Sequence, residues 1–224
     1  MNEALGPYTD ESLKNLKYVS NEPKNLYKQN IPRMNKALII IDLQYDFCDG
    51  GPMANANSLI IIPKINSIRD DYNLVIFIKK THSHDNSSFK GFGGSIPLHC
   101  IVNTYGSQLH SDLIVNSFDV TINYCNSNSA FYDDQDKETL TQLKYILQVN
   151  KIEKLYFCGN NMETSIFSTV FDAINYGFRC FIISDMIGYI DSNKQQNRAR
   201  FLSTMDVEFV QKSWICVFLN SWIY

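Results

Sequence analysis

A buried parallel strand is predicted by the sequence Ala37-Leu38-Ile39-Ile40-Ile41, which is apolar throughout and ends at Asp42. Strands of a parallel sheet are covered on both faces, so their sequences are continuously apolar instead of alternating. Similar runs follow at intervals along the chain. We expect them to form the other strands of one sheet, at residues 74–78, 118–122, 154–158, 180–183 and 207–210.

Helical patterns lie between these runs, at residues 59–69, 137–149, 164–176 and 193–204. The third pattern places Ile166, Val170 and Ile174 on one helical face. Alternating strands and helices predict the α/β class, with a three-layer α/β/α arrangement around a central, mostly parallel sheet of about six strands. Ligands of such folds bind beyond the carboxyl ends of the strands.

The composition is that of one globular domain. The 224 residues are 45% hydrophobic and 19% charged, and the net charge is −3. No basic face is implied, which argues against nucleic acid as a partner. We interpret residues 1–35 as a polar N-terminal arm and residues 36–224 as the folded domain.

The six cysteines contain no CxxC pair, and no apolar run reaches the roughly 20 residues that span a membrane. The polar N-terminus lacks the apolar core of a secretory signal. These features predict a protein of the reducing cytoplasm that has no membrane partner.

Two side chains are candidates for catalysis. Asp42 follows the first strand, where a general base is expected; a turn-capping role is the alternative. Ser165 lies in the first helical turn after the strand 154–158, where unpaired backbone N–H groups can stabilise an oxyanion and a nucleophile is expected. The alternative for Ser165 is a hydrogen bond to the backbone, and Glu163 is expected to cap the helix start from three residues after Asn160.

All four histidines lie in residues 81–112, a long stretch without periodicity. His82 and His84 project to the same side of an extended chain. With His99 they supply three imidazoles for zinc or another divalent metal. The alternative is that these are surface histidines of a polar loop.

Five motifs, in order, resemble nicotinamidases and the wider isochorismatase-like cysteine hydrolases. The resemblance covers roughly residues 36–215. The matching segments are residues 37–51, 96–106 (for Trp-Pro-x-His-Cys-Val-x-Gly-Thr-x-Gly), 110–113 (for His-Pro-Asp-Leu), 129–131 (Ser-Ala-Phe) and 159–165 (for Gly-x-x-x-(Asp/Glu)-x-Cys).

In that family a cysteine thiolate attacks an amide, an aspartate moves the proton, and a lysine polarises the pair. The resemblance implies that Asp42 is the aspartate and that Ser165 stands at the cysteine position. The lysine, which normally precedes Ser-Ala-Phe, is absent, and Asn123 or Cys125 occupies the expected equivalent position.

The resemblance also implies a ligand pocket. Nicotinamidases use an Asp/His/His metal site to bind the pyridine nitrogen, and His82, His84 and His99 match its positions. Phe47 matches one wall of the ring pocket, and Ile96 replaces the tryptophan of the other. In the turn before Ser165, we expect Asn161 and Met162 to contact the ligand.

The favoured hypothesis is a family member inactive or much altered as an amidase, because a serine hydroxyl is a far weaker nucleophile than a thiolate. It would retain a cleft for a small molecule such as a pyridine carboxamide. The alternative is an active amidohydrolase that converts nicotinamide to nicotinate and ammonia. Activity would then need a relocated nucleophile (Cys125 or Cys48), a positive charge from Lys80, or water activated by a metal.

A third hypothesis is a structural subunit, because the family forms oligomers. The apolar segment at residues 214–224 is a candidate contact of a homo-oligomer. A final strand or helix packed on the core is the alternative.

Overall fold

Parallel strands form one sheet, as the apolar runs predict. The computed structural model describes residues 35–134 and 137–212, so most of the expected arm and the segment at 214–224 lie outside the described residues. The sheet of the described residues has the order β3-β2-β1-β4-β5-β6, and all its pairings are parallel. Its strands are β1 (Lys36–Ile41), β2 (Leu74–Lys80), β3 (Val120–Tyr124), β4 (Lys154–Gly159), β5 (Arg179–Ile187) and β6 (Val207–Val210).

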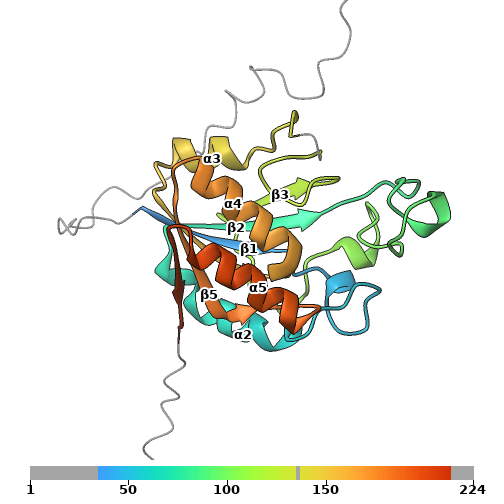
Figure 1. Cartoon of the computed structure of the whole chain (residues 1–224), viewed down its shortest axis with the longest axis horizontal. Helices are drawn as coiled ribbons and strands as arrows, with labels where there is room; N and C mark the ends of the chain where they lie inside the picture. Colours follow the sequence, from blue (N-terminus) through green and yellow to red (C-terminus); the bar gives the residue numbers. More distant parts are fainter. Residues whose placement is uncertain (1–34, 135–136, 213–224) are drawn as a thin grey trace, which may run out of the picture. The chain divides into compact units, whose positions relative to one another are not determined.

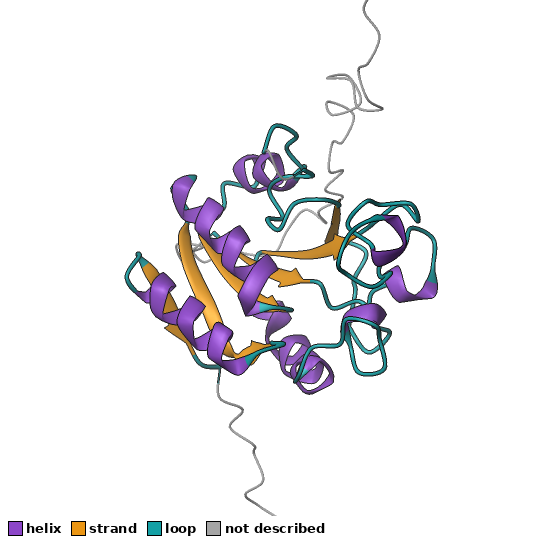
Figure 2. Cartoon of the chain, turned by 45° about the vertical axis from the view of Figure 1, so that its right-hand side comes forward, coloured by secondary structure: helices purple, strands orange, loops and turns teal. Residues whose placement is uncertain are grey.

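Helices cover both faces of the sheet, which confirms the predicted α/β/α class (Figure 2). One face packs against α2 (Ser58–Ile68), and the other packs against α3 (Leu143–Val149), α4 (Phe167–Asn175) and α5 (Ser192–Ser203). The central strand β1 supplies both cores, because successive side chains point to opposite faces. Ile39 and Ile41 belong to the α3–α5 side, and Leu38 and Ile40 to the α2 side.

Several predicted boundaries are wrong: β5 extends to Ile187 instead of residue 183, and two other elements begin later than predicted. The third strand covers residues 120–124 instead of 118–122, because Asp119 is held outside the sheet by the buried Arg69, whose Nη2 lies 2.7 Å from each carboxylate oxygen. The helix predicted at 137–149 begins only at Leu143. Before it, the Thr141 N–H donates to the carbonyl of Phe131 in an extended pairing.

The loops that follow β1 and β2 extend beyond the carboxyl ends of the strands, on the right of Figure 1. Asp46 fastens them together, since its Oδ2 accepts the Cys100 N–H at 2.6 Å. Gly106 lies so close to this carboxylate that an added Cβ would meet Asp46 Oδ1 at 2.1 Å. This edge of the sheet therefore carries a closely packed loop cluster above Asp42.

Among residues 35–134 and 137–212, no helix has the length and hydropathy needed to cross a bilayer.

Candidate active site

Asp42 leaves β1 in a left-handed backbone conformation, with a φ of +52°. Few residues adopt this conformation, and Asp is among those that tolerate it best. The Asp42 N–H donates to the Ile78 carbonyl at 2.9 Å, which fixes the exit of the chain from the sheet. The side chain is 2% exposed, and its Oδ1 has no hydrogen-bond partner among the described residues. Burial raises the pKa of the carboxyl, and the Lys80 charge opposes this effect.

A tyrosine hydroxyl connects the two candidate catalytic side chains. The hydroxyl of Tyr124 lies 2.7 Å from Asp42 Oδ2 and 2.9 Å from Ser165 Oγ. A phenol carries one proton, and an ionised carboxylate can only accept. When Asp42 is ionised, Tyr124 therefore donates to Asp42 and accepts from Ser165. Burial and then the Asp42 charge raise the pKa of Tyr124 well above its ordinary value, so the phenol stays protonated.

Tyr124 is missing from the sequence prediction, which places Asn123 or Cys125 at the lysine position. Along β3 the burial alternates, so that Ile122 and Tyr124 are buried whereas Asn123 is exposed. The same alternation, extended by two residues from the predicted strand end, identifies Tyr124 as the residue that faces the site.

Ser165 lies in a π-helical turn, Met162–Ile166, that precedes α4. Its side chain is 5% exposed, and its carbonyl accepts from the Thr169 hydroxyl at 2.7 Å. Asn161 caps this turn, because its Oδ1 accepts the Thr164 N–H at 3.0 Å. The helix predicted at 164–176 is observed as this π-helical turn followed by α4, Phe167–Asn175, so the helical path begins two residues earlier than predicted.

Glu163 does not cap the helix, so this prediction is wrong. Its Oε1 accepts the backbone N–H groups of Ile190 and Asp191, each at 2.7 Å. These residues follow β5, so Glu163 ties the turn that carries Ser165 to the loop before α5. Asn160, the other half of the expected cap, donates from Nδ2 to the Asp42 carbonyl at 3.2 Å.

Lys80 brings a positive charge to the site from the end of β2. Its side chain is 8% exposed, and Nζ donates to the Ser127 carbonyl at 2.5 Å. Nζ also lies 3.7 Å from the centroid of the Tyr124 ring. Burial lowers the pKa of Lys80 to about 8, against the opposing effect of the Asp42 charge.

The structure brings together two of the three predicted metal ligands. The rings of His82 and His99 are 4.9 Å apart, and both side chains are buried. Burial lowers the pKa of His82 to about 3 and also lowers the pKa of His99, so both are neutral at pH 7. His84 is exposed and its ring packs on Phe92, with centroids 5.8 Å apart.

The predicted metal site is therefore not assembled. No group of three or more His, Cys, Asp or Glu side chains suited to a metal occurs within residues 35–134 and 137–212. His99 Nδ1 lies 3.0 Å from the Pro97 carbonyl, which leaves only Nε2 free to coordinate. Two imidazoles do not make the closed ligand set that a zinc site needs.

Rings gather beside this histidine pair. Phe47 and Phe89 lie 5.4 and 5.5 Å from the His99 ring. Ile96 is half-buried and forms a β-bridge with Phe89. Of the other expected ligand contacts, Asn161 is engaged in its cap, and Met162 is 2% exposed in the α3–α5 core. Cys100 follows His99 in the chain, and burial and then the Asp42 charge raise the pKa of its thiol.

The candidate replacement thiols do not reach the Asp42–Ser165 pair by any hydrogen bond within the described residues. Cys48 is buried, and burial raises the pKa of its thiol to about 12. Cys125 is half-buried and contacts His82 instead, with Sγ 3.7 Å from Nδ1. Burial raises the pKa of this thiol too.

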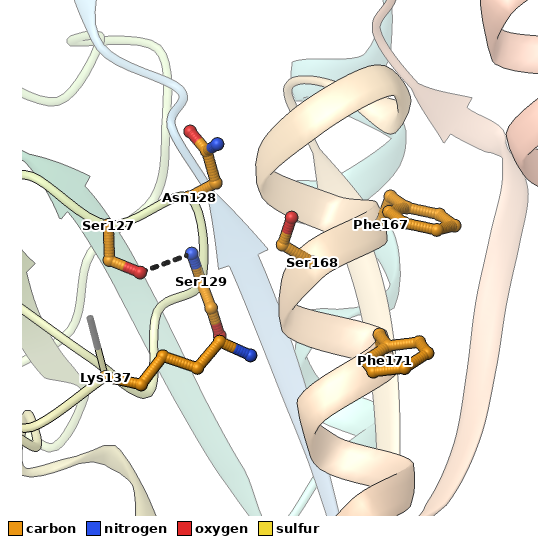
Figure 3. Close-up of a pocket in the computed structure, with 7 residues that line it drawn as sticks. All are labelled: Ser127, Asn128, Ser129, Lys137, Phe167, Ser168 and Phe171. Atoms are coloured by element: carbon orange, nitrogen blue, oxygen red, sulfur yellow. Dashed lines mark hydrogen bonds between the residues drawn. The ribbon is translucent and has the colours of Figure 1, made fainter. Parts of the chain in front are cut away.

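A pocket of about 380 Å³ lies beside α4, between this helix and the loop at 127–129 (Figure 3). Its lining residues are Ser127, Asn128, Ser129, Lys137, Phe167, Ser168 and Phe171. None of the predicted site residues lines it. Two contacts connect its walls to the site: Lys80 bonds to Ser127, and the Ala130 N–H donates to Thr169, which bonds to the Ser165 carbonyl.

Known proteins share this fold. Residues 36–210 match the Isochorismatase domain. The nicotinamidase of Acinetobacter baylyi is 28% identical over 180 residues, which cover 71% of this chain and 84% of that protein. The pyrazinamidase of Pyrococcus horikoshii in complex with zinc gives a TM-score of 0.72 at 26% identity, covering 79% of this chain and 99% of the other. PnC1 from L. infantum in complex with nicotinate shares the fold, with a TM-score of 0.75 at 24% identity and coverages of 80% and 93%.

Proposed function

Because this chain belongs to the Isochorismatase domain family, we propose that it binds a small planar carboxamide at Asp42 and has lost the cysteine amidase chemistry of nicotinamidases. A pyridine carboxamide is the first ligand to test. The observation that carries the proposal is the position of Tyr124, whose hydroxyl hydrogen-bonds both Asp42 and Ser165.

Tyr124 weakens the base available to Ser165. Asp42 Oδ2 already accepts the Tyr124 hydroxyl, and the phenol that lies 2.9 Å from Ser165 Oγ stays protonated. A neutral phenol accepts a proton poorly, and a serine hydroxyl needs a positioned base before it can attack an amide. Loss of the nucleophile from a catalytic unit leaves little of its activity, even where the other members remain.

Asp42 still supports binding. A buried oxygen without a partner is costly, and a ligand that donates to it recovers this free energy. The Oδ1 of Asp42 is such an atom, and a carboxamide offers N–H donors. The rings of Phe47 and His99, with centroids 5.4 Å apart, supply flat surface that suits a planar aromatic ligand.

The test is calorimetric titration with nicotinamide and nicotinate, together with an assay for ammonia release. We expect binding of nicotinamide without ammonia above the protein-free rate. Asp42→Ala should weaken binding, whereas the exposed His84→Ala should not. Ammonia release that disappears in Ser165→Ala would refute the proposal.

That refuting result defines the second candidate, an amidohydrolase. One observation favours it: Ser165 Oγ, the Tyr124 hydroxyl and Asp42 Oδ2 form a continuous hydrogen-bonded path, with steps of 2.9 and 2.7 Å. A proton could leave Ser165 along this path as the hydroxyl attacks the carbonyl carbon. Tyr124→Phe would then abolish ammonia release.

Self-association is a separate proposal. Ile114, Val115 and Phe118 are 50–71% exposed in one loop, and we propose that these exposed apolar side chains contact a second copy of the chain. Light scattering measures the molar mass in solution, and a molar mass of one chain would exclude self-association.

A further inference from the structure

We propose that Lys80 is the positioning cation of this site, and that it acts from β2 across the ring of Tyr124 in place of the lysine absent before Ser-Ala-Phe. The inference rests on the proposed function in one respect, namely that Asp42 is the group that faces the ligand.

The strand register carries the first step. Lys80 and Tyr124 are paired residues at the ends of β2 and β3. Their side chains therefore rise from adjacent strands at the same level of the sheet. The ammonium contacts one face of the ring, while the hydroxyl at the ring edge reaches Asp42.

The second step is the fixed backbone of Lys80. The side-chain oxygen of Gln44 accepts the Lys80 N–H at 2.7 Å, and Gln44 Nε2 donates to the Lys80 carbonyl at 2.8 Å. Gln44 is fully buried and lies two residues after Asp42. The same short segment thus places the carboxylate and fixes the backbone that bears the ammonium.

The third step concerns the free energy of a buried charge. An isolated ammonium is strongly disfavoured away from water unless negative charge lies close to it. Within the described residues, Nζ contacts one carbonyl, that of Ser127, and one ring face, that of Tyr124. A neutral donor would satisfy the Ser127 carbonyl equally well. If Lys80 had only this structural role, its positive charge would not be needed. Asp42 has the largest effect among the negative groups that favour the charged form of Lys80. Smaller effects in the same direction come from Cys125, Cys100 and Asp133.

Together these residues rebuild a carboxylate and an ammonium in one buried site, with a phenol between them. In this arrangement, Lys80 stabilises the charged form of Asp42 and keeps the Tyr124 hydroxyl directed towards it. Lys80 itself touches no ligand, so it is a positioning residue.

The first experiment compares Lys80→Gln with Lys80→Arg. Gln keeps a donor for the Ser127 carbonyl and removes the charge, whereas Arg keeps the charge. We would follow the ¹³C signal of the Asp42 carboxyl through a pH titration. The midpoint should rise by about one pH unit or more in Lys80→Gln and stay near the wild-type value in Lys80→Arg. Equal midpoints in all three proteins would overturn the inference.

Lys79→Met is the matched control. It removes the same charge from the adjacent position of β2, where the side chain points to the other face. The Asp42 midpoint should not move in this variant. An equal rise in Lys79→Met and Lys80→Gln would indicate a general loss of positive charge and would also overturn the inference. If Lys80→Gln fails to fold by circular dichroism, Lys80→Met takes its place.

A second experiment measures the reactivity of a thiol introduced at residue 165. In Ser165→Cys we would measure alkylation of the introduced thiol by iodoacetamide, peptide by peptide. Adding Lys80→Gln should slow it about tenfold, the effect of one pH unit on the thiolate fraction, and Lys80→Arg should restore it. An unchanged rate would count against Lys80.

The outcomes for the two proposals are distinguishable. Ammonia release by the wild-type protein would refute the binding function and leave the Asp42 titration to decide on Lys80. Conversely, if the Asp42 midpoint is unchanged in Lys80→Gln and nicotinamide still binds, the positioning role of Lys80 is refuted and the proposed function is not affected.

Discussion

The side chain of Gln44 bonds both the N–H and the carbonyl of Lys80, at 2.7 and 2.8 Å. Gln44 Nε2 also donates to the Ser107 carbonyl at 2.8 Å. One buried amide therefore joins the segment after β1, the end of β2 and the loop at 105–107. This contact holds the edge of the sheet on which Asp42 lies.

Gln44→Ala should lower the free energy of unfolding by about 2–4 kcal/mol, because it leaves buried backbone groups of Lys80 and Ser107 without partners. Urea denaturation measures the change. The exposed Gln196→Ala is the control, and it should have little effect. A loss below about 0.5 kcal/mol would show that water replaces the amide.

The free energy of unfolding of Asp42→Asn, relative to that of the wild-type protein, should increase as the pH rises. Burial raises the Asp42 pKa in the folded protein. Because the Asp42 pKa is higher in the folded state than in the unfolded state, its contribution to stability is fully present at a pH below the unfolded-state pKa. This contribution is lost as the pH rises through the folded-state pKa. Urea denaturation between pH 3.5 and 7 should show that the free energy of unfolding of the variant increases relative to that of the wild-type protein. A difference independent of pH, or equal to that of the exposed Asp49→Asn, would contradict this.

Glu163→Ala should destabilise the turn that carries Ser165. The variant loses two charge-assisted hydrogen bonds to the N–H groups of Ile190 and Asp191. We expect a loss of about 2–3 kcal/mol and faster hydrogen exchange of these two amides. Glu163→Gln keeps an accepting oxygen and should lose less. Equal losses in both variants would show that the charge, and not the geometry, is decisive.

Zinc should bind weakly and be removed by dialysis, because only His82 and His99 approach each other. Binding should fall in His99→Ala and remain unchanged in His84→Ala, whose ring is exposed beside Phe92. Metal analysis and zinc calorimetry measure both. Stoichiometric zinc that survives dialysis and disappears in His84→Ala would mean that the loop rearranges to assemble all three histidines.

The sheet was predictable because strands buried on both faces have continuously apolar sequences. The apolar runs at 37–41 and 74–78 lie inside β1 and β2 as observed. Alternation with helical patterns then determined the layers. Strand ends were less predictable: Asp119 is removed from β3 by Arg69, a partner 50 residues away, and no local pattern reports such a contact.

The site was predictable only in part. Position after a strand identified Asp42, and the turn before α4 identified Ser165. The connection between them was missed, because Tyr124 belongs to a strand whose predicted end fell two residues short. Lys80 was considered as a source of charge, but its contact with Tyr124 depends on the strand register. His84 was wrongly grouped with His82, because the i, i+2 rule assumes an extended chain, and the chain turns there.

The strand that delivers Tyr124 lies at the border of the sheet, since β3 pairs only with β2 among the described strands. Border strands open more readily than central ones, and they can do so while the rest of the molecule stays folded. Such an opening would withdraw the phenol and leave Asp42 and Ser165, which are anchored in the interior, facing each other. Amide exchange along β3, compared with exchange along the central strand β1, would measure how often the site opens in this way.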